Sequence, residues 1–380
     1  MTESLEETKV EAPGRAAWEA PVDPALASIG DKLARGGRLD FEDGLACLET
    51  HDLIGLGRLA LNVRTRLYGD EAYYVANQHL NYTNICINHC RFCAFHRAPG
   101  HPEGYLMTPE EAAGRIAATD ANDVREVHVV GGCNPEPDLA YYVARLEALG
   151  RARPGLKLKA FTAVEIAHIA SRAGCATREV LERLRGAGLS AMPGGGAEVF
   201  SERIHQALFP RKIGADEWLA VHGEAHALGL RTNATLLFGH IETHAERVEH
   251  LLRLRRQQDL SGGFQCFILL PFHPANTPMA HLPGPSGVDI LKTMALSRLM
   301  LDNIPHLKAY WIMLGLKLTQ VALHFGADDL EGTIVQERIA HQAGAATAQG
   351  LTRAQVEAMI TAAGFRPVER NTFHERVEAA

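Results

Sequence analysis

Three cysteines lie within eight residues, in the sequence Cys86-Ile-Asn-His-Cys90-Arg-Phe-Cys93, and form the frame Cys-x3-Cys-x2-Cys. The preceding residues, 79–85, alternate apolar with polar side chains as a strand does, so the cysteines are predicted to lie on the loop that leaves a strand. A loop can turn three thiolates towards one point, and soft sulfur ligands select zinc, copper(I) or an iron–sulfur cluster. The spacing therefore predicts a metal or cluster site.

Three interpretations of this stretch remain open at the level of the residues alone. On a helix, the three positions would share one face and the cysteines would be ordinary buried side chains, although structural cysteines rarely cluster so tightly. A closed zinc site would need a fourth ligand, for which His89 and His96 are the candidates. A 4Fe–4S cubane held by three cysteines would leave one iron open to a small molecule, unlike an electron-transfer cluster with four protein ligands.

The composition limits the class of protein. The chain has 380 residues, of which 46% are hydrophobic and 22% charged, which suits one large α/β barrel with extensions or two ordinary domains. Its net charge of −7 argues against a nucleic-acid partner. We find no secretory signal, and the longest apolar stretch, residues 309–318, is too short for a membrane span and contains Lys317. Seven cysteines without a disulfide framework indicate reducing conditions, so a cytoplasmic location is expected.

Helical and strand-like patterns alternate along most of the chain. Residues 1–21 are polar and are predicted to be disordered or loosely attached, and residues 24–74 are predicted to be helical, with Asp40 as an N-cap. Capping boxes open further helices at Thr108 and Thr352. Other helices are predicted at 137–149, 178–185, 216–228, 245–258 and 288–303. Strands are predicted at 80–85, 127–130, 156–161, 189–192, 232–238, 264–270 and 306–313, with a possible eighth strand at 320–325.

Repeated βα units without a Pro/Gly/Ser-rich linker predict a parallel sheet closed, or nearly closed, into a (βα) barrel. The predicted division is a tail (1–21), an N-terminal helical cap (22–78), the barrel (79–332) and a C-terminal helical extension (333–380). In such barrels the chemistry lies at the carboxyl ends of the strands. The residues that follow the first six predicted strands fit this rule, because they are the cysteines, Gly131-Gly132, Glu165, residues 193–198, residues 239–243 and residues 271–277.

From about residue 30 onward the chain resembles the aminofutalosine synthases of the futalosine route to menaquinone, a family of radical S-adenosylmethionine (SAM) enzymes. The cysteine frame with an aromatic residue before the third cysteine is typical of the superfamily. Six further phrases carry the family resemblance: residues 79–86 (HLNYTNIC), 160–165 (AFTAVE), 193–198 (PGGGAE), 238–243 (FGHIET), 282–289 (LPGPSGVD) and 308–317 (KAYWIMLGLK).

The resemblance implies a radical SAM barrel of full or nearly full TIM type, in which Cys86, Cys90 and Cys93 hold a 4Fe–4S cluster and SAM binds the open iron. The implied substrate is 3-[(1-carboxyvinyl)oxy]benzoate, to which a 5′-deoxyadenosyl radical adds. Aryl migration and loss of a carboxyl would then give 6-amino-6-deoxyfutalosine and methionine. An electron donor of the flavodoxin or ferredoxin type is the implied partner. The related cyclic dehypoxanthine futalosine synthases are the same-class alternative, and a zinc or iron–sulfur structural or electron-transfer protein is the alternative from another class.

Further residues are expected to bind SAM and substrate. Gly131 and Gly132 would let the backbone approach the methionine part of SAM, or would simply form a turn. The superfamily often has glutamate after this pair, whereas this chain has Cys133. Glu165 and Glu198 would accept hydrogen bonds from the SAM amino group or ribose, or would cap the following helices. The substrate-side candidates are His240, Glu242, His273 and Asn276, and no acid or base is assigned because radical addition needs none.

Overall fold

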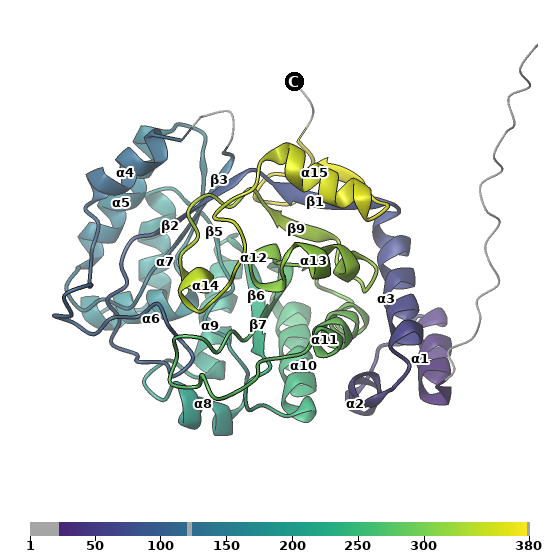
Figure 1. Ribbon diagram of the computed structural model, residues 1–380. Helices are drawn as coiled ribbons and strands as arrows, with labels where there is room; N and C mark the ends of the chain where they lie inside the picture. Colours follow the sequence, from purple (N-terminus) through teal and green to yellow (C-terminus); the bar gives the residue numbers. More distant parts are fainter. Residues whose placement is uncertain (1–22, 120–123, 378–380) are drawn as a thin grey trace, which may run out of the picture.

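The computed structural model describes residues 23–119 and 124–377, so the predicted tail at 1–21 lies outside the described residues. A sheet of ten strands forms the centre of the fold, and helices surround it (Figure 1). All strand pairs are parallel, in the order β10-β1-β9-β8-β7-β6-β5-β4-β3-β2. The strands are β1 (Glu71–Val75), β2 (Asn77–Asn81), β3 (Glu126–Val130), β4 (Lys157–Ala160), β5 (Leu189–Met192), β6 (Arg231–Phe238), β7 (Phe264–Pro271), β8 (His306–Lys308), β9 (Asp329–Gly332) and β10 (Arg366–Glu369).

The curled sheet joins its two ends beyond β9. Residues that follow β9 return to β2, where Val335 forms a parallel bridge with Gln78 and its carbonyl accepts a hydrogen bond of 2.9 Å from the amide of His79. Strands β2 to β9 therefore form the predicted (βα) barrel, and β1 and β10 extend the sheet past β9. Parallel strands joined through helices are the expected product of the βα alternation in the sequence.

The helices form the outer layer of the barrel. The predicted capping boxes at Asp40, Thr108 and Thr352 are confirmed, each with its reciprocal side-chain and backbone hydrogen bonds. Helices α1 to α3 pack against α10 and α11 (Figure 1). The helices are α1 (Pro24–Ala34), α2 (Phe41–Glu49), α3 (Leu53–Tyr68), α4 (Pro109–Ala117), α5 (Leu139–Ala152), α6 (Ala163–Ala173), α7 (Thr177–Gly186), α8 (Glu202–Leu208), α9 (Ala215–Ala227), α10 (His244–Ser261), α11 (Gly287–Met300), α12 (Trp311–Leu314), α13 (Leu316–Leu323), α14 (Ile339–Gln342) and α15 (Arg353–Ala362).

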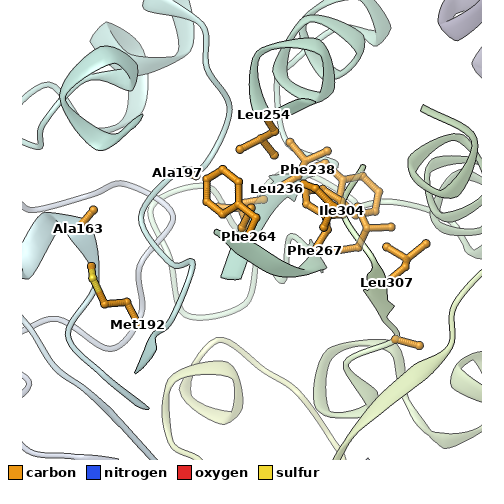
Figure 2. Close-up of a cluster of buried hydrophobic side chains, with 14 of the residues drawn as sticks. Ala163, Met192, Ala197, Leu236, Phe238, Leu254, Phe264, Phe267, Ile304 and Leu307 are labelled. Carbon is orange, nitrogen blue, oxygen red and sulfur yellow. The ribbon is translucent and has the colours of Figure 1, made fainter. Parts of the chain in front are cut away.

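The hydrophobic core lies between the strands and these helices. Figure 2 shows Phe238 of β6 and Phe264 and Phe267 of β7 packed together with Leu254 of α10. Burying a large apolar side chain contributes about 1.5–3 kcal/mol, so this layer stabilises the central strands. Those strands carry the site at their carboxyl ends.

Several sequence predictions are wrong in element type or in bounds. The first strand, predicted at 80–85, is β2 (Asn77–Asn81), and the C-terminal extension that was predicted to be helical also contains β10. Residues 71–74 were expected to be helical, but α3 ends at Tyr68, Gly69 follows with a φ of 60°, and β1 begins at Glu71. The possible strand at 320–325 overlaps α13, and the eighth barrel strand is β9 instead. The strand predicted at 306–313 is shorter in the structure, because β8 ends at Lys308 and the helix α12 begins at Trp311.

The strand β9 was missed because its sequence, Asp329-Leu-Glu331-Gly, has low strand propensity. Its acidic side chains have partners outside β9: Glu331 pairs with Lys308 of β8, and Asp329 lies 2.5 Å from the guanidinium of Arg370, which follows β10. A further buried pair joins Lys159 of β4 to a carboxylate of β3 at 2.8 Å. Buried charges need such partners, and local sequence does not reveal them.

Candidate active site

A cavity of about 340 Å³ opens at the carboxyl ends of the barrel strands. One end is lined by the three cysteines, Gly131-Gly132, Glu165, residues 193–196 and Glu198. Apolar side chains also line the cavity: Leu237 of β6, Ile268 and Leu270 of β7, Phe272 after β7, and Met313 of α12. The other end is lined by the polar side chains of His79, His128, Tyr310, Glu331 and Glu337. The cysteines and Gly131-Gly132 follow the carboxyl ends of β2 and β3, whereas His79 and His128 lie within these strands, about 10 Å further into the barrel. Two separate polar regions in a largely apolar wall suit an elongated ligand with polar termini.

The three cysteines of the frame all line this cavity, on the irregular loop after β2 and not on a helix. The structure therefore excludes the helical interpretation. A tetrahedral zinc site with Zn–S bonds of about 2.3 Å would place its sulfur atoms about 3.8 Å apart. Among the described residues, the cysteine sulfurs do not belong to any group whose ligand atoms all lie within 4.8 Å of one another. At least one pair of these sulfurs is therefore farther apart than in a closed zinc site.

The cysteine loop is fixed by backbone hydrogen bonds at both ends. The amide of Cys86 donates to the carbonyl of Arg97 at 2.9 Å, and the amide of Arg91 donates to the carbonyl of Leu208 at 2.9 Å. A hydrogen bond from Cys133 lowers the pKa of the Cys86 thiol to about 6, although burial acts in the opposite direction. The Cys86 side chain is therefore suited to bind as a thiolate, the form that ligates iron.

Cys133, which follows the glycine pair, is buried and packed. Its sulfur accepts a hydrogen bond of 3.3 Å from the amide of Asn88, and its carbonyl accepts one of 3.1 Å from the amide of Ile87. Burial and the neighbouring Cys86 raise the pKa of the Cys133 thiol. Cys133 thus supports the loop that presents the ligands.

The glycine pair at the end of β3 lies directly beneath the cysteine loop. A Cβ on Gly132 would lie 2.3 Å from the carbonyl oxygen of Ile85 and 2.8 Å from Cβ of Cys86. A Cβ on Gly131 would lie 2.8 Å from the ring of Tyr82. The two glycines therefore do more than form a turn: because neither has a Cβ atom, the chain after β3 can lie directly against the cysteine loop at the cavity wall.

Glu165 has the capping role that was one of its two alternatives in the sequence, and it also faces the cavity. Its carboxylate accepts from the amide and hydroxyl of Thr162, which caps α6, and it also accepts from the amide of Gly131 at 3.1 Å and the hydroxyl of Tyr82 at 2.8 Å. Burial raises the pKa of Glu165 to about 7, while these hydrogen bonds act against that rise. The residue lines the cavity beside the glycine pair.

Glu198 lies at the same end of the cavity, in a left-handed backbone conformation with a φ of 49°. Its carboxylate pairs with the ammonium group of Lys212, and both side chains are nearly buried. Non-glycine residues in this conformation cost about 1–3 kcal/mol and concentrate at functional sites. Lys212 was not among the residues predicted from sequence, and it lines the cavity with its partner.

The four substrate-side candidates separate into two groups. His273 lines the cavity, and its Nε2 lies 2.9 Å from the carbonyl oxygen of Met313. His240 and Glu242 lie outside the cavity wall, where Nδ1 of the histidine is 2.9 Å from the carboxylate and the guanidinium of Arg247 is 2.7 Å from it. Asn276 is also outside the wall and donates to the carbonyl of Gln342 at 2.9 Å.

Sequence reasoning missed the polar end of the cavity. His79 and His128 occupy corresponding positions on β2 and β3 and are paired directly in the register of the two strands. Their rings are 4.6 Å apart between centroids, and the ring of Tyr310 lies nearly parallel to that of His79. The available signal was a histidine two residues before the end of each of two neighbouring strands.

Comparison with known proteins agrees with this geometry. Residues 80–254 match the family described as the radical SAM superfamily, and residues 261–380 match the family described as the CofH/MqnC C-terminal region. Among solved structures, methylornithine synthase (PylB) has a TM-score of 0.72 at 18% identity, covering 89% of this chain and 97% of that one. The FeFe-hydrogenase maturase HydG from Carboxydothermus hydrogenoformans has a TM-score of 0.73 at 17% identity, covering 92% and 80%. The fold and the site thus define a radical SAM enzyme.

Curated relatives narrow this class. The chain is 44% identical to the aminodeoxyfutalosine synthase of Thermus thermophilus, over 93% of this chain and 96% of that protein. It is 42% identical to the same enzyme of Streptomyces coelicolor, over 91% and 92%. A 5-amino-6-(D-ribitylamino)uracil–L-tyrosine 4-hydroxyphenyl transferase of Methanopyrus kandleri is 38% identical, over 91% and 95%. The chain belongs to the aminodeoxyfutalosine synthase family of radical SAM enzymes. None of the helices in the described residues is long and apolar enough to cross a membrane.

Proposed function

We propose that this enzyme joins the 5′-deoxyadenosyl group of SAM to 3-[(1-carboxyvinyl)oxy]benzoate. The aryl group migrates, one carboxyl is lost as carbon dioxide or bicarbonate, and the products are 6-amino-6-deoxyfutalosine and methionine. Similarity to two aminodeoxyfutalosine synthases along nearly the whole chain supports this reaction. SAM is then a co-substrate that becomes part of the product.

The observation that carries the proposal is the single cavity with the cysteines at one end and a largely apolar wall. In it, Cys86, Cys90 and Cys93 would hold the 4Fe–4S cluster, which supplies the electron that cleaves SAM into methionine and a 5′-deoxyadenosyl radical. An electron donor of the flavodoxin or ferredoxin type would reduce it. The remaining tasks belong to the protein, which must exclude water and place the adenosyl carbon against the alkene.

We assign the SAM contacts to the residues beside the cysteines. Gly131 and Gly132 form the wall against the methionine part, and Glu165 and Glu198 are the anionic acceptors for its ammonium group or the ribose hydroxyls. His273 and the apolar side chains after β6 and β7 then surround the substrate. The three remaining substrate-side candidates would not touch the substrate and would only hold the backbone of nearby loops in place; they are His240, Glu242 and Asn276.

The test is product analysis with anaerobically reconstituted protein, dithionite and SAM. We expect 3-[(1-carboxyvinyl)oxy]benzoate to give a product with the mass of 6-amino-6-deoxyfutalosine. Parallel incubations contain dehypoxanthine futalosine, or 5-amino-6-(D-ribitylamino)uracil with tyrosine. An adduct in one of these alone would assign the enzyme to a related reaction. Zinc without iron or sulfide, or neither deoxyadenosine nor an adduct, would reject the radical mechanism.

A further inference from the structure

The polar end of the cavity contains two neighbouring imidazoles with hydrogen-bonding capacity to spare. The side chain of His79 is 95% buried, and its Nε2 has no hydrogen-bond partner among the described residues. One ring nitrogen of His79, one of His128 and a carboxylate oxygen of Glu331 all lie within 4.8 Å of one another. An unpartnered buried polar atom costs about 1–3 kcal/mol, so a natural ligand is expected to meet it.

The charged groups below the imidazoles are already paired. Glu331 accepts a hydrogen bond from Asn77 at 2.7 Å and pairs with Lys308, and Lys159 pairs with Glu126 at 2.8 Å. The ammonium group of Lys308 beside the carboxylate disfavours a divalent cation at this point. Because Glu331 is neutralised in this way, it does not exclude a ligand carboxylate from the two imidazoles.

The direction of the substrate follows from the position of SAM in the proposed reaction. The alkene must face the adenosyl carbon, at the end of the cavity that holds the cysteines and Gly131-Gly132. The aryl ring then lies along the apolar wall, and its carboxylate, on the side remote from the alkene, reaches the far end. A carboxylate cannot be buried there without hydrogen-bond donors. Glu337, which also lines that end, does not supply a donor, because its carboxylate accepts hydrogen bonds from the amides of Ala340 and His341.

We infer that His79 and His128 form the binding site for the aryl carboxylate of the substrate. The two rings lie side by side on paired strands, so each can present one N–H to a carboxylate oxygen. The assignment rests on the function proposed above and adds a substrate-recognition subsite to it. It requires no metal ion.

The same geometry couples the carboxylate to a proton. Burial lowers the pKa of both imidazoles, so the site is uncharged before the ligand enters. An adjacent carboxylate favours the protonated form of a histidine. The charged and titratable groups that face the two rings are Glu331 and Asp329 of β9, Glu126 of β3, Lys159 of β4, Lys308 of β8, Tyr310 and Glu337. Each of these carboxylates already has a partner: Glu331 pairs with Lys308, Asp329 with Arg370 and Glu126 with Lys159, while Glu337 accepts from the amide of Ala340 and lies 2.8 Å from Nδ1 of His341. A proton taken up by an imidazole is therefore the change in charge that accompanies binding of the ligand.

The test compares two probes that differ only in the aryl carboxylate. Titration calorimetry with the reconstituted holoenzyme and SAM measures Kd for 3-[(1-carboxyvinyl)oxy]benzoate and for (1-carboxyvinyl)oxybenzene. We expect the wild type to prefer the first by about 10- to 100-fold, the range for hydrogen bonds to a charged group. In His79→Gln and His128→Gln this preference falls to within about 3-fold, while an unchanged circular dichroism spectrum and an unchanged iron content show that each variant is folded.

His168→Gln is the matched control, because His168 is half-buried, is bonded through Nε2 to the carbonyl of Asn134 at 2.8 Å, and lies outside the cavity. It should keep the wild-type preference. Titrations in two buffers of different ionisation enthalpy should show proton uptake with the first probe only.

Several results overturn the assignment. They are an equal Kd for both probes in the wild type, an unchanged preference in both histidine variants, or equal proton uptake with both probes. One divalent metal ion per chain in the holoenzyme, lost in His128→Gln, would identify a cation site instead. If the wild type binds the first probe selectively but forms no adduct, the proposed function fails while this subsite stands.

Discussion

Replacing Gly132 with alanine tests whether the glycine pair positions the cluster ligands. The new Cβ would lie 2.3 Å from the carbonyl oxygen of Ile85, so the two loops must separate by about 0.7 Å to reach even 3.0 Å. No rotamer can relieve this contact, because the opposing atom is backbone, and the residue next to it is Cys86, one of the proposed cluster ligands. Overpacking of this kind costs about 1–3 kcal/mol, and a displacement of about 1 Å at a reacting centre can cost about 100-fold in rate.

The assay measures iron and sulfide per chain after anaerobic reconstitution, the rate of deoxyadenosine formation, and the free energy of unfolding in urea. We expect Gly132→Ala to lose most of the cluster or, with the cluster retained, about 100-fold in the rate of SAM cleavage. Gly150→Ala is the control, because Gly150 lies in α5 and its Cβ would meet nothing within 4 Å. That variant should gain up to about 1 kcal/mol from helix propensity. Full cluster content and a wild-type rate in Gly132→Ala would refute the reasoning.

Three other predictions concern ligation, pH and buried charge. Cys90→Ala should abolish cluster iron and deoxyadenosine formation with an unchanged circular dichroism spectrum, and retained cleavage would reject Cys90 as a ligand. Burial lowers the pKa of His226 to about 4. At pH values between about 6.5 and 4, the histidine therefore binds a proton in the unfolded chain and not in the folded chain. The free energy of unfolding should fall by up to about 3 kcal/mol as the pH is lowered through this range. Urea unfolding should show a shallower pH dependence in His226→Gln than in the exposed control His281→Gln, and equal slopes would contradict this. Lys159→Met should lower the free energy of unfolding by about 3–5 kcal/mol in the same assay, because it leaves the carboxylate of Glu126 buried and unpaired. The double variant Lys159→Met, Glu126→Leu should recover most of this loss. If the double variant recovers nothing, the buried ion pair is not the cause.

Much of the fold could be predicted because it is encoded locally. The βα alternation, the N-caps at Asp40, Thr108 and Thr352, and the ends of β3 to β7 are each set by residues within one or two turns of one another. The strands that were missed lack this local signal. β9 contains two acidic side chains that are stable inside the barrel only because Lys308 and Arg370 reach them from other elements.

The same division applies to the site. The cysteine spacing by itself indicated a soft-metal or cluster site, because three soft ligands on one short loop restrict the metal centre before any tertiary contact is considered. The resemblance to radical SAM enzymes, carried by further phrases of the sequence, favoured the cluster over zinc. Only the tertiary structure decided which of the other polar residues face the cavity. His79 and His128 are 49 positions apart in the chain, and the parallel register of β2 and β3 places them side by side, whereas His240 and Glu242 follow a strand end and yet turn towards Arg247. Ligand spacing is a short-range property of the chain, but the direction of a buried polar side chain depends on partners that folding brings from elsewhere.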